Sequence, residues 1–272
     1  ATARFGRNPV THNHAKNGGA VYCPTGSKLE FAQDITFSMN SADEGGGAIY
    51  SATLELNPET HKLTFGNNYA KTKGGAVYVT SSVTVNGNVT FSDNISDGTG
   101  GAVHSNGNVT IQGGAFRKNE AKTDGGAIYA ENDILVKAAE EAKVTLEDHI
   151  AGKSGGALCA RGRIEAENTE FKRNKATEDS GGATRSEVET TLTNCALEGN
   201  SSGKHGGASI AGAVKARQTT FSDNTSTVAG GAVYLTGDGT SSFANCVFLK
   251  NQANANGGAL FLTGNTHILK IE

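Results

Sequence analysis

The chain has 272 residues and a formal charge of −3, so it has no excess of Lys and Arg that could bind a phosphate backbone, and we expect no nucleic-acid partner. Glycine is frequent at 37 residues while proline is rare at 3, a mix typical of many tight turns and few rigid linkers. No apolar run approaches the roughly 20 residues of a membrane helix, and no Cys or His cluster stands at metal-ligand spacing, so we expect no metal and no cofactor.

One phrase recurs along the chain. Residues 91–104 read FSDNISDGTGGAVH, and residues 221–234 read FSDNTSTVAGGAVY. The same Phe-x-x-Asn followed by Gly-Gly-Ala defines ten units over residues 5–262, whose triplets begin at Gly18, Gly46, Gly74, Gly100, Gly125, Gly155, Gly181, Gly206, Gly230 and Gly257. This short, regular period is typical of a solenoid, and the repeats predict a single domain over residues 1–272.

In chain order, the first motif is Phe5 to Asn8, and its Gly pair follows ten residues after the Asn, where most later units have six. The later Asn positions are Asn40, Asn68, Asn94, Asn119, His149, Asn174, Asn200, Asn224 and Asn251. The leading Phe is replaced by Leu146 and Leu197 in two units.

Each unit reads as three short strands. In residues 74–94, Val83, Val85, Val89 and Phe91 alternate with polar residues, which is the period of a half-buried strand. Residues 134–149 are the one stretch that could form a helical turn, although strands flanking a loop fit equally well. Three strands per coil, stacked about ten times, predict an all-β fold, a right-handed three-sided parallel β-helix.

Stacked coils place equivalent residues above one another. We expect the Phe row to face inward, the Asn side chains to hydrogen-bond along an inner corner, and the Gly pairs to form sharp turns. At the two x positions of Phe-x-x-Asn, acidic and basic residues alternate between coils, which predicts ion pairs rather than a catalytic carboxylate pair. We therefore predict a protein that is not an enzyme, with a polysaccharide lyase or hydrolase, a lectin-like β-helix, or a structural spacer as the alternatives.

A second row contains aromatic residues, four positions after each first Gly: Tyr22, Tyr50, Tyr78, Tyr129 and Tyr234, with His104 and Cys159 in the same row. If the residue before each of them points inward, this row points outward. It is then either a self-stacked ladder or an exposed contact surface for sugar or protein.

Alternating FxxN and GGA[ILV] motifs resemble those of the chlamydial polymorphic membrane proteins, which are type V autotransporters. The resemblance implies a secreted passenger domain at the bacterial cell surface or outer membrane. It also implies attachment to a host cell-surface protein or glycan. In that family a C-terminal membrane barrel follows the passenger, so we expect membrane contact only through such a barrel, absent from this sequence. We read the chain as a piece of a longer protein and expect its coils to associate end to end.

The resemblance also assigns adhesion to the motif residues themselves. Long insertions at 53–62 and 131–145 are the alternative place for an adhesive site, while Thr184, Ser209 and His149 depart from the motif. The residues carried over from the family are Phe37, Asn40, Gly46, Gly47, Ala48, Phe65, Asn68, Gly74, Gly75, Ala76, Phe91, Asn94, Gly100, Gly101, Ala102, Phe116, Asn119, Gly125, Gly126, Ala127, Phe171, Asn174, Phe221, Asn224, Gly230, Gly231, Ala232, Phe248, Asn251, Gly257, Gly258 and Ala259.

Overall fold

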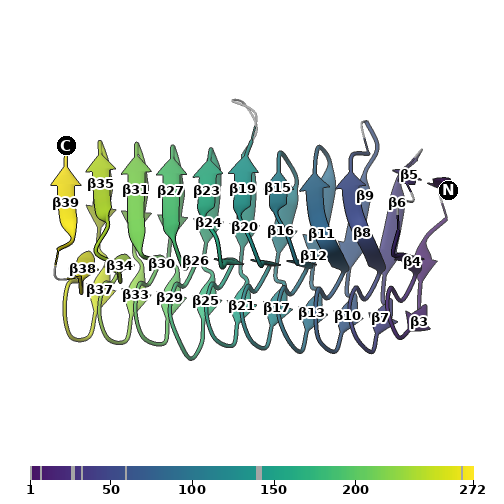
Figure 1. The fold of residues 1–272 in the computed structure, drawn as a ribbon, viewed down its shortest axis with the longest axis horizontal. Helices are drawn as coiled ribbons and strands as arrows, with labels where there is room; N and C mark the ends of the chain where they lie inside the picture. The colour runs from purple at the N-terminus through teal and green to yellow at the C-terminus, as the bar shows by residue number, and fades with distance from the viewer. Residues whose placement is uncertain are drawn as a thin grey trace.

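The computed structural model describes residues 2–6, 8–25, 28–31, 33–58, 60–138, 143–264 and 266–272, with only the backbone of Lys28. The chain winds along one axis as a β-solenoid, and equivalent strands of successive coils lie side by side (Figure 1). All regular secondary structure among these residues is strand, and the coils pair in parallel, so the predicted β-solenoid of about ten turns is confirmed.

The first face contains the strands that carry the Phe row. They form a ten-stranded sheet of β2 (Val10–Thr11), β6 (Ile35–Ser38), β9 (Leu63–Gly66), β12 (Val89–Ser92), β16 (Ala115–Arg117), β20 (Val144–Glu147), β24 (Thr169–Lys172), β28 (Ala196–Glu198), β32 (Thr220–Ser222) and β36 (Val247–Leu249).

The second face follows each Asn and consists of two-residue strands. They are β3 (His14–Ala15), β7 (Ser41–Ala42), β10 (Tyr69–Ala70), β13 (Ile95–Ser96), β17 (Glu120–Ala121), β21 (Ile150–Ala151), β25 (Lys175–Ala176), β29 (Ser201–Ser202), β33 (Thr225–Ser226) and β37 (Gln252–Ala253). The sequence pattern did not predict these strands, because two residues are too few to show a period.

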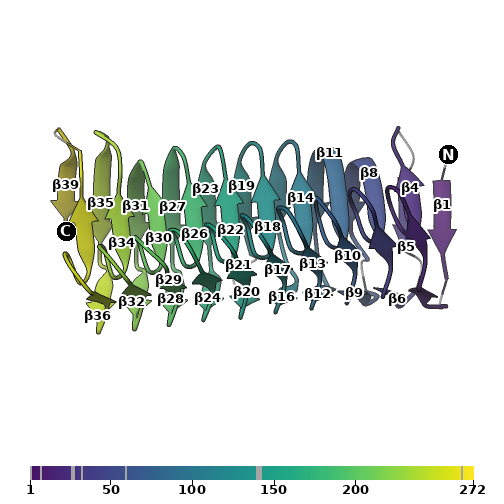
Figure 2. The same cartoon turned by 90° about the horizontal axis from the view of Figure 1, so that it is seen from below.

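The third face follows each Gly pair, and in most coils a bend divides it into two columns (Figure 2). Its strands are β4 (Val21–Cys23), the long β8 (Ile49–Leu56) and β11 (Val77–Val85), then β14 (Val103–Ser105), β15 (Val109–Ile111), β18 (Ile128–Ala130), β19 (Ile134–Lys137), β22 (Leu158–Ala160), β23 (Ile164–Glu167), β26 (Thr184–Ser186), β27 (Glu189–Thr193), β30 (Ser209–Ala211), β31 (Ala213–Arg217), β34 (Val233–Leu235), β35 (Thr240–Ala244), β38 (Leu260–Leu262) and β39 (Ile268–Ile271). A coil therefore has up to four strands, not three. We call the bend between the columns the outer bend.

The core forms because the repeat brings identical side chains into register. Phe37 pairs with Phe65, and Phe65 pairs with Phe91. Their rings are fully buried and stack with centroid distances of 5.2 Å and 4.8 Å. Stacking at this spacing stabilises the fold beyond the burial of each ring. One sequence motif therefore provides the packing between successive coils.

The Gly pair permits the turn between the second and third faces. Gly100 has φ +66°, a conformation that residues with a Cβ rarely adopt. A Cβ on Gly101 would lie 2.1 Å from the carbonyl oxygen of Gly126 on the next coil. The second Gly is therefore required by the close approach of two backbones.

The first coil differs from the prediction. Phe5 belongs to β1 (Thr2–Phe5), which pairs with β5 (Lys28–Phe31) in a separate two-stranded sheet. Val10 occupies the Phe position opposite Phe37, and Asn13, not Asn8, bonds to Asn40. The choice of Phe5 and Asn8 was wrong because Val10 to Asn13 keeps the same spacing with an aliphatic residue in place of Phe, and it lies closer to the Gly pair.

Two coils depart from the apolar residue after the triplet. Thr184 and Ser209 are both fully buried, and the Thr184 hydroxyl donates to Ser209 Oγ at 2.9 Å. The pairing satisfies polar groups that would otherwise cost free energy in the core, so the fold continues through these positions.

Candidate functional site

The Asn side chains form a buried ladder at the corner between the first and second faces, interrupted at one coil by His149. Asn68 Nδ2 donates to Asn94 Oδ1 at 3.0 Å, and Asn94 Nδ2 donates to Asn119 Oδ1 at 2.9 Å. Each amide also caps the first face, since Asn94 Nδ2 donates to the carbonyl oxygen of Phe65. The residue before each ladder Asn is left-handed, as at Asp93 with φ 56°, so the ladder holds the chain in a strained turn. The predicted structural stack is confirmed.

His149 replaces Asn in this ladder and is completely buried. Its Nδ1 accepts a hydrogen bond from the Asn119 backbone N–H at 3.0 Å, which fixes the proton of the neutral ring on Nε2. Nε2 has no partner of good geometry, and burial lowers the pKa of His149 to about 3. Protonation would place two donors face to face at this coil.

Charged residues beside the ladder pair between coils. Arg173 binds Asp148, with Nε and Oδ1 2.8 Å apart, and also contacts Glu147. These contacts raise the pKa of the Arg173 guanidinium and lower the pKa of the Asp148 carboxyl. The predicted alternation of acids and bases is confirmed here, and it leaves these carboxylates as ion-pair partners rather than as a catalytic pair.

The motif residues assigned to adhesion lie mostly inside the coil. Phe37, Phe65, Phe91, Phe116, Phe171 and Phe221 are fully buried, as are the Asn and Ala of their motifs to within 1%. In the last coil, Phe248, Asn251 and Ala259 are half-buried and Gly257 and Gly258 are exposed. A receptor that contacts the side wall therefore does not meet the buried motif side chains, and their part in adhesion stays a prediction.

The aromatic row is a self-stacked ladder. Tyr22 and Tyr50 lie 5.0 Å apart, as do Tyr50 and Tyr78, and Tyr78 meets His104 at 5.2 Å. Tyr22 is 59% exposed, whereas Tyr50, Tyr78 and Tyr234 are half-buried. Because the rings pack against each other, much of their area is unavailable for stacking on a sugar.

Three members of this row contradict the expected outward exposure. His104 is only 1% exposed, Tyr129 7% and Cys159 2%. Burial raises the pKa of the Cys159 thiol to about 12, so it is a poor candidate for an intermolecular crosslink. The expectation failed because residues flanking the row cover it: Thr99 and Asn106, for example, both hydrogen-bond the ring of His104.

The side wall has a hollow at the outer bend of four successive coils. Three residues, 161–163, separate β22 from β23, and two, 187–188, separate β26 from β27. Only Gly212 separates β30 from β31, and four residues, 236–239, separate β34 from β35. The bend at Gly212 is therefore shorter than the bends of the neighbouring coils, and the surface is depressed there. We call this depression the bend hollow.

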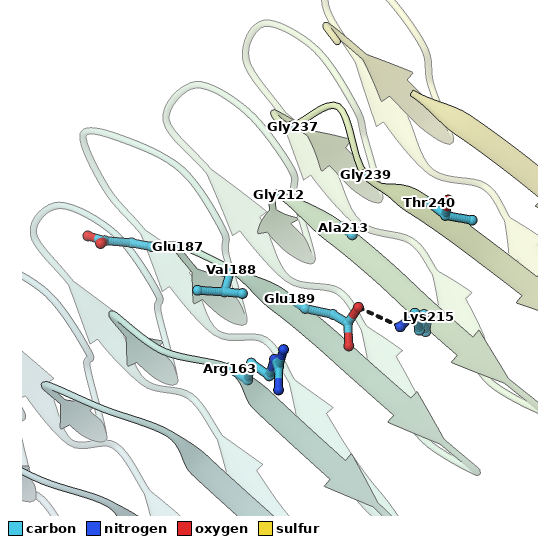
Figure 3. Close-up of a pocket in the computed structure, with 10 residues that line it drawn as sticks. All are labelled: Arg163, Glu187, Val188, Glu189, Gly212, Ala213, Lys215, Gly237, Gly239 and Thr240. Carbon is cyan, nitrogen blue, oxygen red and sulfur yellow. Dashed lines mark ion pairs between the residues drawn. The ribbon is translucent and has the colours of Figure 1, made fainter. Parts of the chain in front are cut away.

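Charged, apolar and backbone groups line the bend hollow, which has a volume of about 430 Å³. Arg163 and Glu187 lie at one end, with Val188 between them, and Glu189 pairs with Lys215 along one rim at 2.7 Å (Figure 3). Gly212, Ala213, Gly237 and Gly239 supply a floor almost free of side chains, and Thr240 completes the lining.

Sequence reasoning missed this hollow, although the signal was present. The Gly-Gly-Ala triplets from Gly155 onward are spaced by 26, 25, 24 and then 27 residues. These steps shorten and lengthen together with the outer bend, because the rest of each coil is nearly constant. The long insertions favoured instead include residues 59 and 139–142, which lie outside the described part of the chain.

Other site types find no support in the described residues. No group of three or more His, Cys, Asp or Glu in this part of the chain could hold a metal ion. No helix among the same residues is long and apolar enough to cross a membrane. The described side wall offers the exposed end of the aromatic row and the bend hollow as candidate surfaces for a partner. A second hollow, of about 610 Å³, lies near the N-terminal end and is lined by Pro9, Asp34, Ile35, Thr36, Lys62 and Thr64.

Comparison with known proteins supports the resemblance noted in the sequence. The model of the Chlamydia polymorphic membrane protein repeat matches residues 34–52, 62–80, 88–106, 106–131, 218–236 and 245–263. Each matched segment contains one copy of Phe-x-x-Asn and the Gly-Gly-Ala that follows it. None of the residues that line the bend hollow falls within a matched segment.

No curated protein and no solved structure matches the chain significantly. The six matches nevertheless coincide with six coils of the solenoid and include its Phe and Asn ladders. The repeat that the family model describes is therefore the same repeat that forms one coil in the structure. The chain belongs to the family of proteins built from the Chlamydia polymorphic membrane protein repeat.

Proposed function

We propose that this chain is a non-enzymatic passenger segment that attaches a bacterial surface to a host cell. The observation that carries the proposal is the six family repeats folded into one solenoid. These repeats suggest an autotransporter passenger at the cell surface or outer membrane. A host cell-surface protein or glycan is then the natural partner of the exposed side wall.

The structure supports different roles for the buried and the outward-facing residues of such a passenger. The motif residues build a stiff rod, since Phe91 and Asn94 are fully buried. Outward-facing residues of the same strands change along part of the stack: Thr64 and Thr90 are identical register partners, but Ala115 follows Thr90. Constant interior packing with a variable exterior gives a long surface on which contacts can differ without loss of the fold.

Binding to cells tests the proposal directly. The purified chain is immobilised on fluorescent beads, and beads bound per epithelial cell are counted by flow cytometry. Beads carrying the same chain after irreversible heat denaturation, and beads carrying an unrelated β-solenoid of similar charge, are the matched controls. Binding above both controls that soluble chain competes away supports adhesion. Binding equal to either control would refute it.

A further inference from the structure

We propose that the bend hollow binds a short extended segment of a partner protein, in which an apolar side chain lies between an acidic and a basic residue. The proposal names the class of partner for the adhesion proposed above and rests on it. It follows from three features of the hollow: its floor, its apolar contact and its uncompensated charges.

The floor lets a second backbone approach closely. Gly212, Gly237 and Gly239 carry no side chain, and Ala213 carries only a methyl group. The hollow spans the outer bends that precede β23, β27, β31 and β35, and parallel strands lie about 4.8 Å apart. It is therefore roughly 14 Å long, which matches four to five residues of extended chain at about 3.3 Å each.

Val188 supplies the apolar contact. Its side chain is 46% exposed, although it lies in a depression with a methyl group, Ala213, among its neighbours in the lining. An apolar side chain of a partner resting on Val188 would remove both surfaces from water. This is the favourable term that an extended segment needs to offset the entropy lost on ordering.

The charged residues of the hollow determine which side chains should flank the apolar residue of the partner. Elsewhere on the wall many charges pair between coils, and within the hollow Glu189 and Lys215 do so at 2.7 Å. Among the residues that the structure describes, Arg163 and Glu187 form no ion pair within 4 Å. Glu187 interacts with Arg161 and Arg185 only at longer range, through its charge. If the partner placed an acidic residue at Arg163 and a basic residue at Glu187, these two charges would also be paired, like those of the other coils.

The same charges argue against an acidic glycan. Glu187 and Glu189 would repel a carboxylated or sulfated sugar that approached Arg163. No aromatic ring lines the hollow, so a neutral sugar has no face on which to stack. A peptide with charges of both signs fits both observations.

A set of nine fluorescent peptides tests the chemistry. Each has the sequence Ser-Gly-X-Leu-Z-Gly-Ser, with X and Z each Asp, Lys or Asn, and binding to the full chain is followed by fluorescence anisotropy. We expect the two peptides with one acid and one base to bind most tightly, in one of the two orders, and the Asp/Asp and Lys/Lys peptides at least about tenfold more weakly. Equal affinities, or binding of none of the nine, would overturn the proposal.

Variants locate the binding. R163E should weaken the best peptide at least about tenfold and should favour the peptide in which its Asp is replaced by Lys. G239L should abolish binding by filling the hollow. A Cβ at Gly239 would lie 3.2 Å from Ala213 Cβ, a tight contact with a side-chain methyl group rather than with backbone, which a small shift relieves. K153E, a charge reversal at an exposed residue outside the hollow, is the matched control and should bind normally. Circular dichroism and thermal unfolding establish that each variant is folded.

The cell assay separates this proposal from adhesion itself. If beads with the native chain bind cells while R163E and G239L beads bind far less, and if trypsin treatment of the cells removes the difference, the hollow and a protein partner are both supported. If all folded variants bind cells as the native chain does, adhesion stands and the hollow proposal fails. If glycosidase but not trypsin treatment removes the binding that depends on Arg163, the partner is a glycan and the proposal is overturned.

Discussion

Two turns of the same coil behave in opposite ways. The Asn corner has the same length in coil after coil and joins its neighbours through buried amides, such as Asn68 to Asn94 at 3.0 Å. Across the four coils of the bend hollow, the outer bend varies from one residue at Gly212 to four at 236–239, and its residues are largely exposed. Where every coil must satisfy the same buried donors, length cannot change. Where the turn faces water, it can, and a recognition surface can arise there.

The largest effect should come from closing the space between two coils. G101A places a methyl carbon 2.1 Å from the Gly126 carbonyl oxygen, and backbone atoms cannot move aside without breaking the sheet. We expect a loss of about 3–5 kcal/mol in the free energy of unfolding, measured by urea titration. G66A is the matched control, because its nearest neighbour is Ser92 Oγ at 3.6 Å, and it should change stability by less than about 0.5 kcal/mol.

Breaking the Asn ladder should cost nearly as much. N94L removes the donor to Phe65 and Asn119 and the acceptor of the Asn68 amide, so buried groups on two coils lose their partners. A loss of about 3 kcal/mol is expected from chemical unfolding. N132L, at an exposed Asn of the outer bend, should have little effect. If the two variants were equally stable, the structural contrast between corner and bend would be wrong.

Lowering the pH should destabilise the folded protein through its buried histidines. Burial lowers the pKa of His149 and of His104 to about 3, while the unfolded chain binds these protons near pH 6.5. The unfolded state therefore holds more protons between these values, and stability falls as the pH is lowered through this window. From pH 7 to pH 5 we expect a loss of about 2 kcal/mol for each of the two residues.

H149N isolates the contribution of the ladder histidine. The amide restores the usual partner of the corner, so this variant should be more stable than the native chain at pH 7 by about 1 kcal/mol. It should also lose about half of the stability change attributed to these two residues between pH 7 and pH 5. Thermal unfolding of both proteins at several pH values measures the difference, and identical pH profiles would count against the buried neutral ring.

The smallest effect should come from the surface ion pairs. R173A removes contacts to Asp148 and Glu147, but its side chain is 54% exposed, so water and salt screen the interaction. The expected loss is below about 1 kcal/mol and should shrink further at 1 M NaCl. A loss comparable with that of N94L would mean that the side wall, and not the ladder, holds the corner together.

Much of the fold could be predicted from the sequence because stacked coils make packing a problem between neighbours. Equal spacing between motifs brings Phe65 onto Phe91 and Asn68 onto Asn94, whatever the rest of the molecule does. The same logic predicted the Gly pair and the ion pairs beside the ladder. It failed in the first coil, where Val10 has the Phe position, because one aliphatic residue carries little signal alone.

The sequence by itself determined the interior of this protein: a β-solenoid whose coils share Phe and Asn ladders, because identical residues at a fixed period must stack. Only the tertiary structure decided what the exterior presents. Tyr129 and Cys159 are buried in a row where His104 stacks on Tyr129 and Arg185 lies beside Cys159. The bend hollow exists because Gly212 lies between two longer bends. Exposure at a surface position depends on what adjacent coils place beside it, and the repeat motif leaves that free.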